Sequence, residues 1–366
     1  MQHRRLGKTN LNVSVIGFGG IKLGRVSFDD ASEAINRALD LGVNFIDTAR
    51  NYRDSERKVG TAIKGRRDEV YVATKTESRG FQGAMKAIET SLRELDIDKI
   101  DLMQLHSVSD EESYQQVMSP DGALRALQKA QVQGMVDHVG VSIHRSHSVM
   151  RQAIESGEFE TLMVAYSPLD QEGVEQEILP MAKAHDMGVI TMKPLSGGLL
   201  ASPNAEKKNE PQRDPIVFGS LWYVISNDAV STAIPGIQTV REVEENVPAG
   251  DVAEKMSEQE HRKLMHEIGR LGIEFRYGQV CLRCGYCQPC PEGIVVPDVF
   301  KAYEMYTAYP DHLRGMGMDL YSSLPVSPEA CVQCGECEER CPAHLPVRER
   351  LKMVTEAFAR LSNDLR

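Results

Sequence analysis

The residues with the most distinctive chemistry in this chain are its eight cysteines, all of which follow residue 280. They form two groups of four, Cys281, Cys284, Cys287 and Cys290, then Cys331, Cys334, Cys337 and Cys341. The N-terminal segment has no apolar export signal, so we expect a cytoplasmic, reducing location in which disulfides do not persist. Closely spaced thiols in such a compartment predict metal binding.

The spacing within each group favours iron–sulfur clusters over other metals. The second group follows C-x2-C-x2-C-x3-C-P, in which three thiolates ligate one [4Fe–4S] cluster and the fourth ligates its neighbour. The first group also ends in Cys-Pro but is one residue shorter between Cys287 and Cys290. We predict two [4Fe–4S] clusters. Two zinc ions are the alternative, although zinc sites usually draw on two separated C-x2-C pairs.

The segment between the two cysteine groups, Asp298–Leu320, has a helical pattern. It is too long for a compact ferredoxin. It therefore predicts a small, mainly helical two-cluster ferredoxin-like domain over residues 276–366.

A second set of reactive side chains lies in the region without cysteines. Asp47, Lys75 and His106 each end a short apolar run, and Tyr52 follows Asp47 closely. A tyrosine can give a proton to a carbonyl oxygen if a lysine stabilises its phenolate and a carboxylate holds that lysine. A histidine near the same oxygen orients it and stabilises developing charge. Each residue alone has an ordinary structural explanation, but their order predicts one catalytic group.

The elements that would position this group alternate regularly over the first 240 residues. Strand-like runs cover residues 13–19, 44–49, 69–75, 99–106, 138–143, 161–167, 188–194 and 230–236. Eight β/α units favour a closed (β/α)8 TIM barrel over residues 1–275 rather than an open doubly wound sheet, and they place the four residues at its C-terminal face. Residues 4–15 predict a hairpin that covers the opposite end.

Helical patterns fill the segments between the strands, with apolar residues recurring every three or four positions. We expect helices at Asp29–Leu41, Ser55–Lys64, Gly83–Leu95, Gly122–Val132, Ser148–Ser156, Val174–His185, Ile216–Ser226 and Ser257–Leu271. The expected caps are Asp29 and Ser55 at N-termini, and Gly42, Gly65, Gly134 and Gly188 at C-termini. The polar stretch Ser202–Pro215 predicts a long loop after the seventh strand.

Several of these segments resemble the aldo-keto reductase family over about residues 3–250. GVNFIDTARNY carries the family's aspartate and tyrosine, YVATK its lysine, and SLRELDIDKIDLMQLH its histidine. The resemblance implies NAD(P)H-dependent interconversion of a carbonyl and an alcohol. It also implies that Tyr52 is the acid or base, that Lys75 and Asp47 tune it, and that His106 orients the carbonyl. The complete chain looks like the subgroup that ends in a two-motif ferredoxin-type domain.

The resemblance also assigns residues to the cofactor, from the nicotinamide through the pyrophosphate to the adenosine. These residues are Ser142, Met192, Lys193, Leu195, Gly197, Glu242, Glu245 and Asn246. The family's lysine and arginine for a 2′-phosphate are Gly236 and Glu242 here, and a carboxylate would repel that phosphate. We therefore expect NAD(H) or NADP(H), with a preference for NAD(H).

The sequence thus predicts a cytoplasmic oxidoreductase that acts on a small aldehyde, ketone or sugar and carries two iron–sulfur clusters. The alternative is an electron-transfer or redox-regulatory protein whose barrel binds nucleotide with little turnover. Replacement of two amide-binding residues of the family by Ile143 and Met163 keeps that alternative open. Clusters move single electrons and a hydride carries two, so a structural, a sensing and an electron-transfer role for the clusters all stay open.

Charge and composition restrict the partners. A net charge of −11 argues against nucleic acid, and no apolar run is long enough to cross a membrane. A redox partner protein is a further candidate. Arg50 and Arg53 near the mouth of the expected site leave an anionic substrate open, although solvated loop charges are the commoner case.

Overall fold

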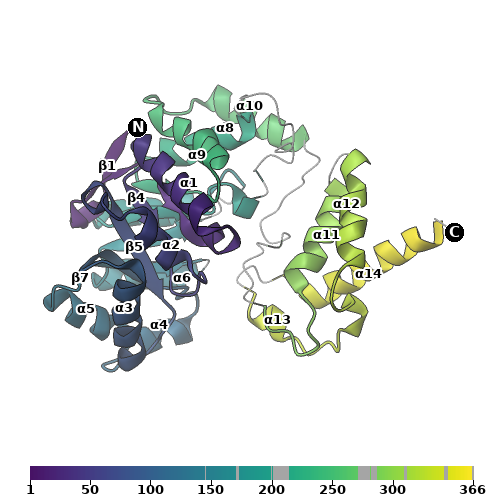
Figure 1. The fold of residues 1–366 in the computed structure, drawn as a ribbon, viewed down its shortest axis with the longest axis horizontal. Coiled ribbons are helices and arrows are strands. Elements are labelled where there is room, and N and C mark those ends of the chain that lie inside the picture. The colour runs from purple at the N-terminus through teal and green to yellow at the C-terminus, as the bar shows by residue number, and fades with distance from the viewer. Residues whose placement is uncertain are drawn as a thin grey trace. The chain divides into compact units, whose positions relative to one another are not determined.

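The computed structural model describes residues 1–144, 146–169, 173–198, 200, 214–270, 281, 287–308, 311–341 and 345–364 (Figure 1). The chain divides into two compact units. The first comprises Met1–Ser202 and Lys208–Met265, and the second is chiefly His266–Arg366. Most of the predicted loop Ser202–Pro215 lies outside the described residues.

The first unit is built on one parallel sheet of eight strands, ordered β3 to β10. The strands are β3 (Phe18–Gly19), β4 (Phe45–Asp47), β5 (Tyr71–Thr76), β6 (Ile100–Leu105), β7 (Val136–Ile143), β8 (Thr161–Ala165), β9 (Gly188–Met192) and β10 (Thr232–Ile234). Each coincides with one of the eight predicted runs, although β5 ends one residue later than its run and β7 begins two residues earlier. Every residue of β6 is buried, which explains why these strands read as nearly continuous apolar runs.

Backbone hydrogen bonds join the first strand of this sheet to the last. The N–H of Gly17 donates to Ala233 O at 2.8 Å, and that of Gly19 donates to Pro235 O at 3.0 Å. A Cβ at residue 19 would lie 2.6 Å from Pro235 O, so only glycine allows this approach. The sheet is therefore closed into the predicted (β/α)8 barrel.

A short hairpin covers the N-terminal ends of the barrel strands, as predicted. It pairs β1 (His3–Arg5) with β2 (Asn12–Ser14) in antiparallel fashion. The Arg4 guanidinium donates to the backbone oxygens of Ile225 (2.7 Å) and Val230 (2.8 Å), just before β10. Gly7 packs directly on Gly188 at the start of β9.

Helices lie between the strands at the predicted positions, and Figure 1 shows them surrounding the strands. They are α1 (Phe28–Asp40), α2 (Ser55–Ala62), α3 (Phe81–Leu95), α5 (Ala123–Val132), α6 (His147–Ser156), α7 (Leu179–Ala184), α8 (Pro215–Ser226), α9 (Val240–Asn246) and α10 (Glu258–Arg270). Two helices were not predicted, α4 (Glu111–Met118) in the loop after β6 and α9 (Val240–Asn246) after β10. Asp110 and Ser113 start α4 with reciprocal capping hydrogen bonds.

Both predicted N-caps are wrong. The residue that caps α1 is Ser27, whose hydroxyl accepts a backbone N–H of the first turn at 3.1 Å, and Asp29 lies inside the helix. Asp54 occupies the N-cap position of α2, and Ser55 is its first helical residue. The Ser55 hydroxyl is instead buried against that of Thr48, at 2.8 Å.

The predicted C-terminal glycines are mostly correct. Gly42, Gly65 and Gly134 all have positive φ where a helix gives way to the next strand. Gly188 is the exception, because it is the first residue of β9. The left-handed conformation after α7 is taken by Asp186, with φ of 51°.

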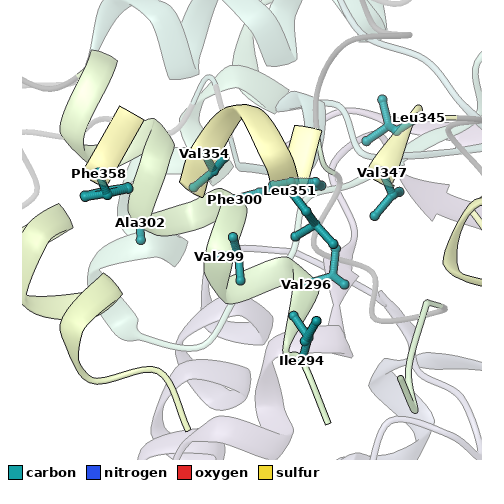
Figure 2. Close-up of a cluster of buried hydrophobic side chains, with 10 residues drawn as sticks. All are labelled: Ile294, Val296, Val299, Phe300, Ala302, Leu345, Val347, Leu351, Val354 and Phe358. Carbon is teal, nitrogen blue, oxygen red and sulfur yellow. The ribbon is translucent and has the colours of Figure 1, made fainter. Parts of the chain in front are cut away.

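The second unit is mainly helical, as predicted. Its helices are α11 (Val296–Ala308), α12 (Asp311–Ser322), α13 (Glu336–Glu339) and α14 (Val347–Asp364). Figure 2 shows side chains of α11 and α14 meeting in its hydrophobic core, which consists of Ile294, Val296, Val299, Phe300, Ala302, Leu345, Val347, Leu351, Val354 and Phe358. Several cysteines border this core. No helix among the described residues is long and apolar enough to span a bilayer.

Candidate active site and cluster site

Two members of the expected catalytic group form a buried ion pair at the C-terminal face of the barrel. Asp47 ends β4, and Lys75 lies one residue before the end of β5. The Lys75 ammonium donates to Asp47 Oδ2 at 2.5 Å and to Thr48 O at 2.7 Å. The side chain of Lys75 is 1% exposed and that of Asp47 is 3% exposed. Because water hardly reaches either charge, each is balanced mainly by the other.

The other two members adjoin this pair. Lys75 Nζ lies 4.9 Å from the centroid of the Tyr52 ring. His106, directly after β6, meets the same ring edge-on, with centroids 5.8 Å apart and an interplanar angle of 81°. The structure thus brings Asp47, Tyr52, Lys75 and His106 together, as the sequence predicts.

Burial dominates the ionisation of the Asp47–Lys75 pair. It raises the pKa of Asp47, and the charge and hydrogen bond of Lys75 oppose that rise. It lowers the pKa of Lys75, which Asp47 opposes in turn. The charged state of each residue therefore depends on the presence of the other.

Tyr52 and His106 are both held in their neutral forms. The protein packed around the half-buried Tyr52, together with the negative charges of Asp47 and Glu77, raises its pKa well above 10. Burial lowers the pKa of His106 well below its usual value, and the positive charges of Lys75, Arg79 and Lys193 add to this. A phenol that keeps its proton and an uncharged imidazole suit proton donation to a substrate oxygen.

Sequence reasoning missed Gln104. Its amide donates to Asp47 Oδ1 at 3.2 Å, and its Oε1 is buried without a hydrogen-bond partner among the described residues. Gln104 lies two residues before His106 on β6, so both side chains emerge on one face of the strand. The sequence signal for this role is a polar residue two positions before His106 in a largely apolar strand.

Glu56 was missed as well. Its carboxylate is 2% exposed, pairs with Arg50, and accepts the hydroxyls of Thr74 (2.6 Å) and Ser91 (2.7 Å). Arg50 is therefore tied to the interior, whereas Arg53 stays exposed with φ of 55°. Because Arg50 and Glu56 flank Tyr52 in sequence, their pairing fixes the turn that carries the tyrosine.

The residues expected at the nicotinamide end lie on neighbouring strands. Ser142 is fully buried on β7, and its Oγ has no hydrogen-bond partner among the described residues. Met192 ends β9, and Lys193 Nζ lies 3.0 Å from Nδ1 of His144. A buried hydroxyl without a partner fits a carboxamide, which can both donate and accept.

The residues expected at the pyrophosphate and the adenosine follow β9 and β10. Leu195 is nearly buried, and Gly197 has φ of 70° in the turn Ser196–Gly198. Such a turn offers backbone N–H groups to a phosphate. Glu242, Glu245 and Asn246 all lie on α9. These side chains and the catalytic group occupy one end of the barrel, so they fit the expected dinucleotide.

Cysteines of both groups line one small cavity in the second unit. They are Cys287 and Cys290 from the first group, with Cys331, Cys334 and Cys337 from the second. Three cysteines of the second group thus line the same cavity as the third and fourth cysteines of the first. This fits the crossed ligation of two-cluster ferredoxins, in which the last cysteine of each run serves the other cluster.

Cys281 and Cys341, the remaining described cysteines, both pack against the hydrophobic core of the second unit. Cys284 lies outside the described residues. Burial and the negative charge of Glu338 raise the pKa of Cys337 to about 11, so a bound metal would have to displace its proton.

The described residues include no group of three histidine, cysteine or carboxylate side chains arranged to hold a single metal ion. A cubane does not need such an arrangement, because its thiolates bind separate iron atoms.

Comparison with known proteins matches both units. Residues 15–217 match the family described as "Aldo/keto reductase family", and residues 280–345 match a "4Fe-4S dicluster domain". An uncharacterised oxidoreductase of Bacillus subtilis is 25% identical over 303 residues, covering 72% of this chain and 95% of the relative. The L-galactose dehydrogenase of Arabidopsis thaliana is 29% identical over 280 residues, covering 67% and 87%.

Solved structures agree on the barrel. The holo form of an aldo-keto reductase from Bacillus halodurans is 26% identical with a TM-score of 0.61, covering 73% of this chain and 96% of that one. An enzyme from Klebsiella pneumoniae solved with NADP and acetate is 26% identical with a TM-score of 0.58, covering 74% and 95%. This chain therefore belongs to the aldo/keto reductase family and carries a C-terminal 4Fe–4S dicluster domain.

Proposed function

We propose that this protein is an NAD(P)H-dependent oxidoreductase that interconverts a carbonyl and an alcohol, with Tyr52 as the proton donor and acceptor. The observation that carries the proposal is that the Tyr52 ring adjoins both Lys75 Nζ and the His106 ring at the C-terminal face of the barrel. Relatives with related chemistry in their names are an L-galactose dehydrogenase and a methylglyoxal reductase. An aldehyde, ketone or sugar is therefore the proposed substrate.

In the direction of reduction, Tyr52 donates its phenolic proton to the substrate oxygen. The raised pKa of the phenol keeps that proton in place until a substrate with developing negative charge accepts it. The positive charge of Lys75 then lies beside the phenolate that forms, and Asp47 keeps Lys75 in position. The neutral His106 can donate a hydrogen bond to the same oxygen.

The bound nicotinamide would supply or accept the hydride. Ser142 would hold its amide, and the turn that contains Leu195 and Gly197 would hold the pyrophosphate. Glu242 favours NAD(H), because its carboxylate would repel a 2′-phosphate. Lys22 offsets part of that repulsion, since its Nζ lies 2.9 Å from Glu242 Oε1.

We also propose two [4Fe–4S] clusters with crossed ligands. Cys331, Cys334, Cys337 and Cys290 would hold one, and Cys281, Cys284, Cys287 and Cys341 the other. The thiols border the core of the second unit, which favours a structural role in its folding. Solvent-accessible thiols that bind clusters need reducing surroundings, so a cytoplasmic location belongs to the same proposal.

The decisive experiment compares the wild-type chain with Tyr52→Phe on a panel of aldehydes, ketones and sugars, with NADH and with NADPH. We expect wild-type turnover and a loss of about 100-fold or more in kcat for the variant, with nucleotide binding retained. If both proteins are inert while nucleotide still binds, the alternative of a redox or regulatory protein replaces this proposal.

The clusters are tested separately, by anaerobic purification with iron, sulfide and zinc analysis. Iron and acid-labile sulfide in equal amounts are expected. A colourless protein with stoichiometric zinc and no sulfide would contradict the cluster assignment.

A further inference from the structure

Lys22 occupies the space above Gly236, directly after β10. Lys22 belongs to the 3-10 turn Gly20–Arg25 that follows β3. A Cβ at residue 236 would lie 3.1 Å from Ile21 Cγ2 and 3.5 Å from Lys22 Cε. A lysine from the first barrel loop thus covers the position at which the family resemblance expects a lysine.

The ammonium of Lys22 is paired with the carboxylate that was expected to repel a 2′-phosphate. Its Nζ lies 2.9 Å from Glu242 Oε1, and each side chain is 26% exposed. The other carboxylate oxygen accepts the N–H of Gln238 at 2.8 Å. Both carboxylate oxygens of Glu242 therefore already accept hydrogen bonds. Neither can accept one from a ribose hydroxyl unless Lys22 moves.

The turn that carries Lys22 is anchored independently of this pair. Lys58, which is 3% exposed, donates to the backbone oxygens of Leu23 (2.9 Å) and Val26 (2.7 Å). Glu242 is fixed too, because its N–H donates to the hydroxyl of Thr239, the N-cap of α9. The part that can move is the flexible side chain of Lys22, which can pair either with Glu242 or with another anion nearby.

We infer that the Lys22–Glu242 pair determines nucleotide selectivity at the adenosine end of the site, with Lys22 as the cation that a 2′-phosphate recruits. The inference rests on the proposed function. Lys22 neutralises Glu242 when the nucleotide carries a 2′-hydroxyl, and the pair stays intact. A 2′-phosphate carries nearly two negative charges and draws Lys22 away from the singly charged carboxylate. Lys22 therefore favours NADP(H) and Glu242 opposes it.

Calorimetric titration of the full-length protein with NADH, NADPH and 2′,5′-ADP tests this without any turnover. For Lys22→Met we expect NADPH and 2′,5′-ADP to bind about tenfold more weakly, because a charge-assisted contact is lost. NADH should change by less than about threefold, since a partly exposed ion pair contributes little. Glu242→Gln should tighten NADPH about tenfold by removing the competing carboxylate.

The matched control is Lys64→Met, because Lys64 is an exposed lysine that follows α2, pairs with Asp96 and takes no part in the site. It should leave every affinity unchanged, and a retained NADH affinity in the other variants shows that they are folded. If Lys22→Met and Glu242→Gln shift NADH and NADPH by equal factors, the inference is wrong. If the wild type binds none of the three nucleotides, the proposed function itself fails, and the inference fails with it.

Discussion

Lys75 and Asp47 form a 2.5 Å hydrogen bond in which neither side chain has appreciable contact with water. Lys75 also donates a hydrogen bond to the backbone oxygen of Thr48, the residue that follows Asp47 at the end of β4. The amide of Gln104, on β6, donates to the carboxylate of Asp47. Three barrel strands thus converge on one ion pair, and Tyr52 lies against it.

Removing one partner of this pair should destabilise the barrel strongly. Asp47→Asn leaves the ammonium of Lys75 buried without a countercharge, and we expect a loss of about 3–5 kcal/mol in the free energy of unfolding. Asp186→Asn is the control, because Asp186 and its partner Arg5 are each 53% exposed and this substitution should change the free energy of unfolding little. Chemical denaturation measures both. Adding Lys75→Met to Asp47→Asn should recover part of the loss, and equal losses for Asp47→Asn and Asp186→Asn would contradict the role of burial.

His106 should make the stability of the barrel depend on pH. Its pKa is lowered in the folded protein, so below about pH 6.5 the unfolded chain binds the proton more readily. The contribution of His106 is complete above that pH and is lost as the pH falls, with a slope of at most about 1.4 kcal/mol per pH unit. Thermal unfolding of wild type and His106→Gln between about pH 7 and pH 5 measures the difference. A constant difference across that range would show that His106 titrates normally.

Glu56 should act on catalysis through the turn that carries Tyr52. Glu56→Gln keeps the size of the side chain but removes the charge that holds Arg50. We expect a loss of about 1–3 kcal/mol in stability and a fall in kcat, with the Kd for nucleotide unchanged. Glu69→Gln, in an exposed pair with Arg66, is the control. A double variant with Arg50→Met should recover stability but not kcat. Normal kcat in Glu56→Gln would limit the residue to a structural role.

Crossed ligation makes a specific prediction about cysteine pairs. If Cys290 and Cys331 serve one cluster, Cys290→Ser and Cys331→Ser should each remove about half of the iron and sulfide, and the double variant should lose no more than either alone. Cys290→Ser combined with Cys281→Ser should remove both clusters. If Cys290 and Cys281 instead behave as one unit, each run of cysteines binds its own cluster and the crossed assignment is wrong.

The sequence predicted the barrel well because its signals are local and repeated. Each buried strand reads as an apolar run, and residues at or next to the C-terminal ends of β4, β5 and β6 carry the reactive side chains. Caps were harder to place, since Ser27, Asp29 and Asp30 are all capable acceptors and only the backbone path selects Ser27. The partners of the site were harder still. Glu56 joins Thr74 and Ser91 across three elements, and Lys22 reaches Glu242 from the other end of the barrel sequence. Contacts of that kind depend on closure of the sheet.

The pairing of β3 with β10, which closes the barrel, also determines when during protein synthesis the barrel can form. Chains leave the ribosome N-terminus first, so the barrel cannot close until β10 has been synthesised. Every cysteine follows β10, and none has yet been translated when the last barrel strand is complete. On each newly made molecule, synthesis of the last barrel strand therefore precedes synthesis of every cluster ligand. A ribosome-bound chain that has exposed residues 1–270 should already resist protease, and iron starvation should leave that resistance unchanged.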